Sequence, residues 1–211
     1  MTAAGLLVSL FPLGVVSGAI ACLVWLASAP SLVPVAALLA VLYVLPLVAF
    51  RFHQLVAPLR AGGSRLDGTS YVPWWGGHQI QLIYIAIPQL EALLRMVPGL
   101  YSLWLRGWGS RIGRRVHWTP LVEVTDRSLL EVGDGVVFGH RAVVFGHVIR
   151  HGKQNMLLYV RPVRIGDGVF IGAGSAIGPG AVIGAGARLD AETRVYPMQV
   201  VDAAEAGGGQ P

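Results

Sequence analysis

The chain of 211 residues contains one cysteine and few charged side chains: 13% of residues are charged and 54% are hydrophobic. Soluble domains carry about 25% charged residues. Cys22 has no partner in the chain, which excludes a disulfide scaffold. The many apolar residues exclude intrinsic disorder, and the absence of a Gly-x-x-x-x-Gly-Lys-Ser/Thr run excludes a P-loop. The 28 glycines are too many for a helical bundle and lack the collagen period, so the sequence predicts a membrane protein with a glycine-rich extramembrane part.

The first fifty residues contain no Asp, Glu, Lys, Arg or His. Two apolar runs, 3–28 and 32–50, are separated by an Ala-Pro-Ser break. Each approaches or exceeds the roughly 20 residues that cross a bilayer core. The segment is too long for a cleaved signal peptide and lacks a basic start. We therefore predict a transmembrane helical hairpin over residues 1–50, the alternative being a hairpin buried in a soluble core.

The positive charge is concentrated directly after this segment. Residues 51–120 carry eight Lys or Arg and two acids, whereas residues 121–211 carry eight bases and nine acids. The bases are spread among apolar residues, which favours anionic membrane lipids over nucleic acid as a partner. By the positive-inside bias, both ends of the hairpin and the following domain face the cytoplasm. The expected location is the inner, or cytoplasmic, membrane.

Residues 71–108 form a second apolar zone with tryptophans near its ends and with Pro88 and Pro98 in its interior. Glu91 and Arg95 interrupt it, which disfavours a third membrane crossing. Broken helices with flanking tryptophans are typical of the membrane interface. We therefore predict an interfacial, amphipathic helical linker over residues 51–108.

An aliphatic residue recurs at every sixth position from Ile165 to Val195, and four of these six residues are followed by glycine. Neither the 3.6-residue period of a helix nor the two-residue period of a strand explains this spacing. Short fixed repeats of this kind indicate a parallel β-helix in which three hexapeptides close one coil. Ile165 then stacks on Ile183. We assign residues 109–202 to this domain and residues 203–211 to a disordered tail.

The register is less regular upstream. The period is kept from Ile112 to Val124, slips by two residues, and resumes from Val132 to Val144. Val132 and Ile165 are 33 residues apart, which is not a multiple of six, so an insertion must separate them. We predict an extruded loop over residues 150–162.

The repeats, with Val-Gly-Asp-Gly at 132–135 and Ile-Gly-Asp-Gly at 165–168, resemble the hexapeptide-repeat acyltransferases. The resemblance implies a left-handed parallel β-helix, a homotrimer, and acyl-CoA or acetyl-CoA as the donor. Four shorter segments resemble the membrane-anchored branch, which includes the terminal modules of polylysine-synthetase-type peptide synthetases: 104–106, 111–113, 145–147 and 162–166.

The reaction of such enzymes needs a general base, and histidine suits this role because its pKa lies near neutrality. His147 directly precedes the insertion and matches the glycine–histidine of the resemblance, so we assign it as the base. His140 is the second catalytic candidate. The alternative for both is a surface residue at a corner of the β-helix. The remaining histidines are assigned structural or interfacial roles.

Residues near the base are candidates for binding the acceptor. Asp126 and Glu131 can orient an imidazole or bind an acceptor amine, and Asn155 lies in the insertion. Asp134 and Asp167 lie in Gly-Asp-Gly corners, where aspartate commonly bonds the turn backbone. From the resemblance, the donor is expected along the later coils, at Gly172, Ala173, Gly184, Ala185 and Arg188.

These observations predict a membrane-associated acyltransferase that moves an acyl group from a thioester to a hydroxyl or amine of a lipid-linked or amphiphilic acceptor. Three alternatives stay open: a non-enzymatic trimeric membrane scaffold, a carrier-dependent amide-forming module, and a metalloprotein like the gamma-class carbonic anhydrases. For the last, a histidine is expected five residues after His140, but position 145 is Phe. We therefore expect no metal.

Overall fold

A computed structural model describes residues 2–152 and 155–203, and the chain divides into two compact units. One unit contains residues 1–59 and 67–86, and the other contains residues 60–66 and 87–211. The linker expected over residues 51–108 is thus divided between the two units. Most of the expected tail lies outside the described residues.

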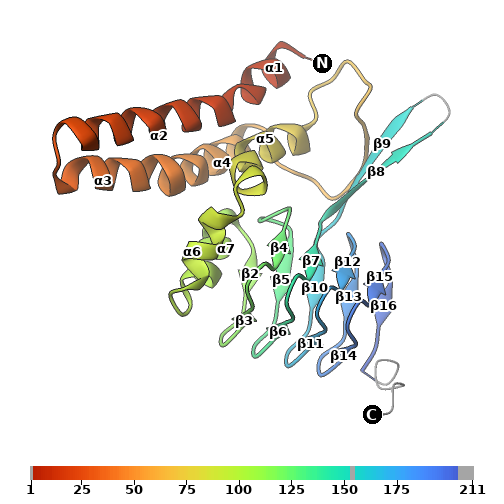
Figure 1. Cartoon of the computed structure of the whole chain (residues 1–211). Helices are drawn as coiled ribbons and strands as arrows, with labels where there is room; N and C mark the ends of the chain where they lie inside the picture. The colour runs from red at the N-terminus through yellow and green to blue at the C-terminus, as the bar shows by residue number, and fades with distance from the viewer. Residues whose placement is uncertain (1, 153–154, 204–211) are drawn as a thin grey trace. The chain divides into compact units, whose positions relative to one another are not determined.

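The first unit is helical. Its elements are α1 (Ala3–Ser9), α2 (Phe11–Ser28), α3 (Leu32–Leu39), a π-helical turn (Ala40–Val44), α4 (Leu45–Val56) and α5 (Pro73–Ala86). Two continuous helical segments, Ala3–Ser28 and Leu32–Val56, are long and apolar enough to cross a membrane, and few of their residues are buried. They run antiparallel beside one another (Figure 1). The second segment continues past Arg51, where the uncharged run ends.

Helix α5 packs against α1, α2 and α4 within this unit, which the sequence does not predict. Its glycine pair permits the approach, because a Cβ at Gly77 would lie 3.2 Å from the Phe50 ring. The Tyr84 hydroxyl donates a hydrogen bond to the Leu42 carbonyl at 2.6 Å. Small residues at a helix interface let the backbones pack closely.

The second unit is built on a parallel β-helix with three sheets (Figure 1). Sheet B contains β2 (Arg111–Ile112), β5 (Leu130–Val132), β10 (Val163–Ile165), β13 (Val182–Ile183) and β16 (Val200–Val201). Sheet C contains β3 (His117–Trp118), β6 (Val137–Phe138), β11 (Phe170–Ile171) and β14 (Arg188–Leu189). Sheet D contains β4 (Glu123–Val124), β7 (Val143–Val144), β12 (Ala176–Ile177) and β15 (Arg194–Val195).

The register of these sheets confirms the predicted stacking. Ile165 pairs with Ile183 in the next coil and with Val132 in the coil before it. The aliphatic residues of the repeat are buried; Ile171 and Ile177 have no exposed surface. The six-residue period therefore identifies the side chains that fill the interior of the column.

The corners between sheets explain the Gly-Asp-Gly sequences. A Cβ at Gly133 would overlap Asp167 and the backbone of Gly166 in the next coil, so only glycine fits there. Asp134 Oδ1 accepts a hydrogen bond from the Arg114 amide at 2.7 Å, and Asp167 Oδ1 accepts one from the Asp134 amide at 2.7 Å. These aspartates link successive coils.

Helices α6 (Gln89–Arg95) and α7 (Leu100–Trp108) close the N-terminal end of the column. The Trp118 ring stacks on Phe138 inside the first coils, at 4.4 Å between ring centroids. Tyr101 of α7 meets Trp118 edge-on at 5.1 Å, and the Ser102 hydroxyl accepts a hydrogen bond from its indole nitrogen. The apolar face of α7 thus covers an end that would otherwise expose the core to water.

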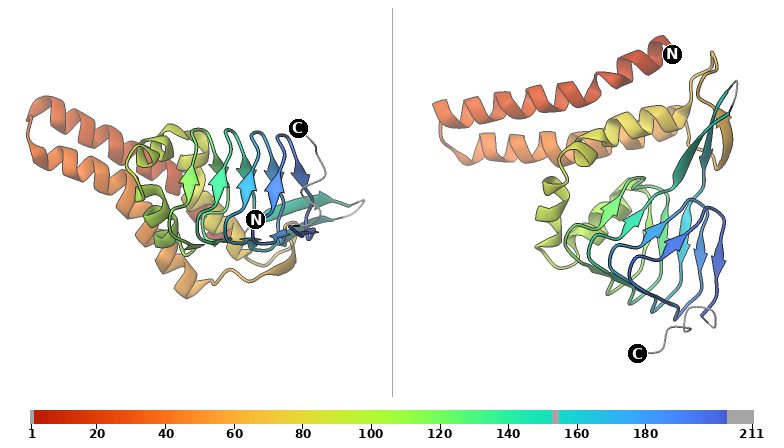
Figure 2. Two further views of the ribbon diagram at one scale, coloured as in Figure 1. Left: turned by 90° about the horizontal axis from the view of Figure 1, so that it is seen from below. Right: turned by 45° about the vertical axis from the view of Figure 1, so that its right-hand side comes forward.

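The insertion is a β-hairpin rather than the expected loop. Strands β8 (His147–His151) and β9 (Met156–Val160) pair antiparallel, and β1 (Gly62–Arg65) adds a third strand alongside β9. The hairpin leaves the column between β7 and β10 (Figure 2). Burial alternates over the last three residues of β9, with Leu158 and Val160 buried and Tyr159 exposed between them, which fits a strand with one covered face.

Candidate functional site

His147 and Asp126 meet at one corner of the β-helix. Asp126 follows β4, and His147 follows β7 one coil later, so both lie where the chain leaves sheet D at the same corner. The imidazole Nδ1 lies 2.7 Å from Asp126 Oδ2. The carboxyl side chain is 4% exposed and the imidazole 19% exposed. A partly accessible histidine therefore contacts a buried carboxylate.

Two further donors fix this carboxylate. Asp126 Oδ2 accepts hydrogen bonds from the Gly146 amide at 2.8 Å and from the Thr125 hydroxyl at 3.0 Å. A Cβ at Gly146 would lie 2.8 Å from the Leu129 side chain, so this position requires glycine. The Gly-His sequence thus has a structural reason: glycine lets the strand approach the turn that carries Asp126.

The contact sets the chemistry of the imidazole. A carboxylate accepts only, so the neutral ring carries its proton on Nδ1 and leaves Nε2 as the proton acceptor. When Nε2 takes a proton, the buried carboxylate stabilises the resulting imidazolium, as in serine hydrolase triads. The pair can therefore act as a general base and then return the proton as an acid.

A buried ion pair anchors the turn next to Asp126. The guanidinium of Arg127 contacts the Glu91 carboxylate through both oxygens, at 2.6 and 3.0 Å. Both side chains are almost fully buried. The Ser110 hydroxyl donates to the Arg127 carbonyl at 2.7 Å. Sequence reasoning missed this arrangement, because no local pattern relates Glu91 to a residue 36 positions away.

The second predicted base lies elsewhere. His140 is in the turn between sheets C and D, whereas His147 follows sheet D, so the two occupy different corners of the column. The His140 carbonyl accepts a hydrogen bond from the Gly174 amide, which links two coils. Within one chain, the structure does not bring the two histidines together.

Two predicted acceptor-binding residues are also separate from the pair. Glu131 lies on the outer face of β5, where it forms ion pairs with Arg164 at 3.3 Å and Arg111 at 3.8 Å. Asn155 lies near the tip of the β8–β9 hairpin, and its backbone carbonyl accepts a hydrogen bond from the Gly152 amide. Asp126 alone of the predicted acceptor residues contacts His147 among the described residues, and it orients the imidazole.

The predicted donor-binding residues do not form one surface in a single chain. Gly184 and Ala185 line a shallow groove of about 410 Å³ over β5, β10 and β13. Gly172 and Ala173 lie at the next corner, and Arg188 lies on β14 between the two corners. A Cβ at Gly172 would overlap the backbone of the following coil, so packing accounts for that glycine.

No cluster of three His, Cys, Asp or Glu side chains that could hold a metal ion occurs within residues 2–152 and 155–203. A carbonic-anhydrase-like zinc site needs three converging protein ligands. The described residues around His140 do not supply such a set.

Comparison with known proteins supports the repeat. Residues 162–196 match the model of the bacterial transferase hexapeptide (six repeats) family, which confirms the predicted hexapeptide repeat over that segment. The match spans less than half of the chain. No curated protein matches the sequence.

Several solved structures are also similar to part of the chain. A hexapeptide-repeat acetyltransferase of Vibrio cholerae O1 biovar eltor, complexed with acetyl coenzyme A, is 15% identical; the match covers 60% of this chain and 85% of that chain, with a TM-score of 0.38. A galactoside acetyltransferase in complex with coenzyme A is 16% identical, with coverage of 55% and 76% and a TM-score of 0.35. A serine acetyltransferase isoform 3 of Entamoeba histolytica, in complex with cysteine, is 13% identical, with coverage of 78% and 59% and a TM-score of 0.22. These scores are too low to assign an activity.

Proposed function

We propose that this protein is a membrane-associated acyltransferase. It moves an acyl group from acyl-CoA, or another thioester, to a hydroxyl or amine of a lipid-linked or amphiphilic acceptor. The observation that carries this proposal is the His147–Asp126 pair at a corner of a hexapeptide-repeat β-helix. A fold does not determine an activity, so the argument depends on this site.

The proposed reaction follows from the pair. His147 Nε2 removes the proton of the acceptor hydroxyl or amine as its oxygen or nitrogen attacks the thioester carbonyl carbon. Asp126 stabilises the imidazolium formed in this step. The carbon–sulfur bond then breaks, and the imidazolium returns the proton to the leaving thiolate. The products are the acylated acceptor and the free thiol.

The donor is proposed to lie along the later coils. Gly184 and Ala185 line the groove on sheet B together with Arg164, whose guanidinium forms an ion pair with Glu131 of the same lining. An arginine beside an open groove suits the phosphates of coenzyme A. A complete donor site would require a second chain in the proposed homotrimer, because the residues expected to contact the donor occupy two corners.

Membrane association is supported by the surface of the first unit. Large apolar side chains on both long helical segments are exposed: Leu7 is 72% exposed and Leu32 is 85% exposed. Exposed apolar surface of this extent marks a membrane or protein contact. With basic residues following the second segment, we place the protein in the inner membrane with its β-helix in the cytoplasm.

The test is thiol release from acetyl-CoA by the purified full-length protein with a panel of amphiphilic alcohols and amines. We expect His147→Ala to lower turnover by about 10²–10⁴-fold, the usual contribution of a general base. The control is His151→Ala on the same strand, which should keep turnover. Unchanged turnover in His147→Ala removes this residue from the mechanism.

The same assay separates the alternatives. Turnover that requires a carrier-bound thioester, with free acyl-CoA inactive, identifies the carrier-dependent module. If no donor and acceptor combination supports turnover by folded protein, the scaffold function replaces the enzyme.

A further inference from the structure

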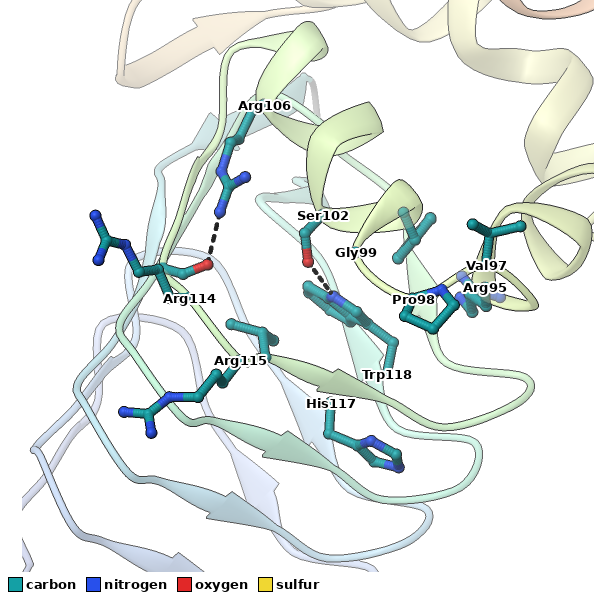
Figure 3. Close-up of a pocket in the computed structure, with 13 residues that line it drawn as sticks. Arg95, Val97, Pro98, Gly99, Ser102, Arg106, Arg114, Arg115, His117 and Trp118 are labelled. Atoms are coloured by element: carbon teal, nitrogen blue, oxygen red, sulfur yellow. Dashed lines mark hydrogen bonds between the residues drawn. The ribbon is translucent and has the colours of Figure 1, made fainter.

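A pocket of about 520 Å³ lies between the α6–α7 segment and the first coil of the β-helix (Figure 3). Its walls come from residues 95–106 and 113–118, all in the second unit. It opens beside the turn that joins β2 to β3, whereas His147 follows β7 at another corner. The pocket is therefore separate from the proposed catalytic pair.

The pocket is strongly basic. Its lining contains no Asp or Glu, and its ionisable bases are Arg95, Arg106, Arg114, Arg115 and His117. In Figure 3 the side chains of Arg114 and Arg115 extend outward from the turn on the same side. Neither forms an ion pair with any residue that the structure describes. Their charges are thus available to an anionic ligand at the mouth.

Arg95 forms the opposite, buried wall. Its side chain is 7% exposed, and its guanidinium lies 4.1 Å from the centre of the Tyr101 ring. Its Nε and Nη2 atoms have no hydrogen-bond partner within residues 2–152 and 155–203. The Glu91 carboxylate oxygen Oε2 is 3.8 Å from Arg95 Nη2, and both oxygens of this carboxylate already accept hydrogen bonds from Arg127. Buried guanidinium donors without an acceptor in the protein need one from water or from a ligand, and a bound anion would supply it.

Arg106 and Ser102 define the remaining wall. The Arg106 guanidinium donates to the carbonyls of Ile112 and Gly113 at 2.8 and 2.7 Å, so it holds the turn rather than a ligand. The Ser102 hydroxyl accepts from the Trp118 indole, and its own proton remains for a further acceptor. The hydrogen bonds of Arg106 and Ser102 therefore attach helix α7 to the β2–β3 segment, and they do not depend on a ligand.

We propose that this pocket binds a phosphate group. Guanidinium groups match phosphate in geometry, and several positive charges in a lining that contains no acid favour a dianion over a single carboxylate. The pocket volume lies in the roughly 300–1,000 Å³ range of small-molecule sites, so the pocket is larger than a phosphate ion alone would require. Val97, Pro98 and Val116 add an apolar wall for the group that carries the phosphate. A phospholipid headgroup and free phosphate share this chemistry.

The experiment measures binding to the full-length protein in detergent or nanodiscs. One arm titrates inorganic phosphate and follows the thermal unfolding midpoint. The other compares nanodiscs of phosphatidylcholine with nanodiscs containing phosphatidic acid, whose headgroup is a phosphomonoester. The variants are Arg95→Gln and the double variant Arg114→Gln/Arg115→Gln. Arg194→Gln, on sheet D and outside the pocket, is the matched control for charge.

We expect saturable binding in at least one arm, and a dissociation constant raised about tenfold or more by each pocket variant, since each removes charge-assisted hydrogen bonds. Arg194→Gln should bind like the wild type. If only the lipid arm responds, the ligand is a headgroup; if inorganic phosphate binds as well, a free phosphate compound suffices. The proposal is overturned by no binding in either arm, or by equal losses in the control and the double variant. The double variant decides the outcome if Arg95→Gln does not fold.

Discussion

Arg127 and Glu91 are 36 residues apart in the chain, yet they form a two-point ion pair that is almost completely buried. The pair joins helix α6 to the turn that carries Asp126. Removing one member of such a pair leaves an uncompensated charge in the interior. The capping helices and the candidate site are therefore energetically coupled.

The first prediction tests this pair. Glu91→Ala should lower the free energy of unfolding by about 3–5 kcal/mol, because Arg127 keeps its charge in a buried position. Denaturant unfolding of the purified protein measures the change. Glu131→Ala is the control: its carboxyl is 34% exposed, so its loss should cost at most about 1 kcal/mol. Equal losses in the two variants would contradict the assigned role of burial.

The second prediction concerns Tyr101 and alkaline pH. Burial, and secondarily the negative charge of Glu91, raise the pKa of the Tyr101 hydroxyl well above its ordinary value of about 10. The unfolded chain then loses this proton before the folded protein does. The contribution of Tyr101 to stability is complete below pH 10 and declines above it, by up to about 1.4 kcal/mol per pH unit.

Tyr101→Phe removes this dependence, because phenylalanine cannot ionise. Unfolding free energies of wild type and variant at pH 8 and about pH 10.5 measure the difference. The wild type should lose more stability than the variant across that interval. A parallel decline in both proteins would place the alkaline sensitivity in other groups.

The third prediction concerns the approach of Gly146 to the turn. In Gly146→Ala, the new methyl meets Leu129 at 2.8 Å and the Asp126 Cβ at 3.2 Å, which displaces His147 from its carboxylate partner. We expect turnover to fall about 10²-fold, since small displacements of catalytic groups have effects of this size. The pH profile of turnover should change as well, because Asp126 no longer orients the imidazole. A variant with unchanged turnover would show that the spacing of this corner is unimportant.

The fourth prediction tests the helical hairpin. Ile20 and Leu39 are both more than half exposed on the two long apolar segments. An arginine near the middle of a membrane helix costs about 2.5–3.5 kcal/mol by insertion scales. Ile20→Arg/Leu39→Arg should therefore move the protein from the carbonate-resistant membrane fraction to the soluble or aggregated fraction. As control, Phe170→Arg on the outer face of sheet C should stay in the membrane fraction.

The sequence predicts the β-helix well because its period has one physical meaning. The aliphatic residue at every sixth position from Ile165 to Val195 points inward, so the interior, the register and the insertion follow from spacing alone. The hairpin at the insertion was harder to predict, since its apolar residues pair with a strand from residues 62–65. No local pattern in residues 62–65 indicates that pairing.

The candidate site was predictable only in part. Gly146-His147 stands out by type and position, and Asp126 by its nearness to a corner. Their contact depends on the slip in register between coils, which brings Val124 and Val144 together. The basic pocket was not predicted, because it requires α6 and α7 to fold back on the first coil. Neither helix carries a sequence signal for that position.

One set of aligned residues crosses all three strands of the sheet formed by β1, β9 and β8. Gly62 is aligned with Val160, and Val160 is aligned with His147. The chain that leaves helix α4 reaches Gly62 within six residues of its last helical residue, Val56. The strand that begins at His147 is thus held, through Val160, by residues 62–65, so a change in that pairing would reach the backbone that carries the imidazole.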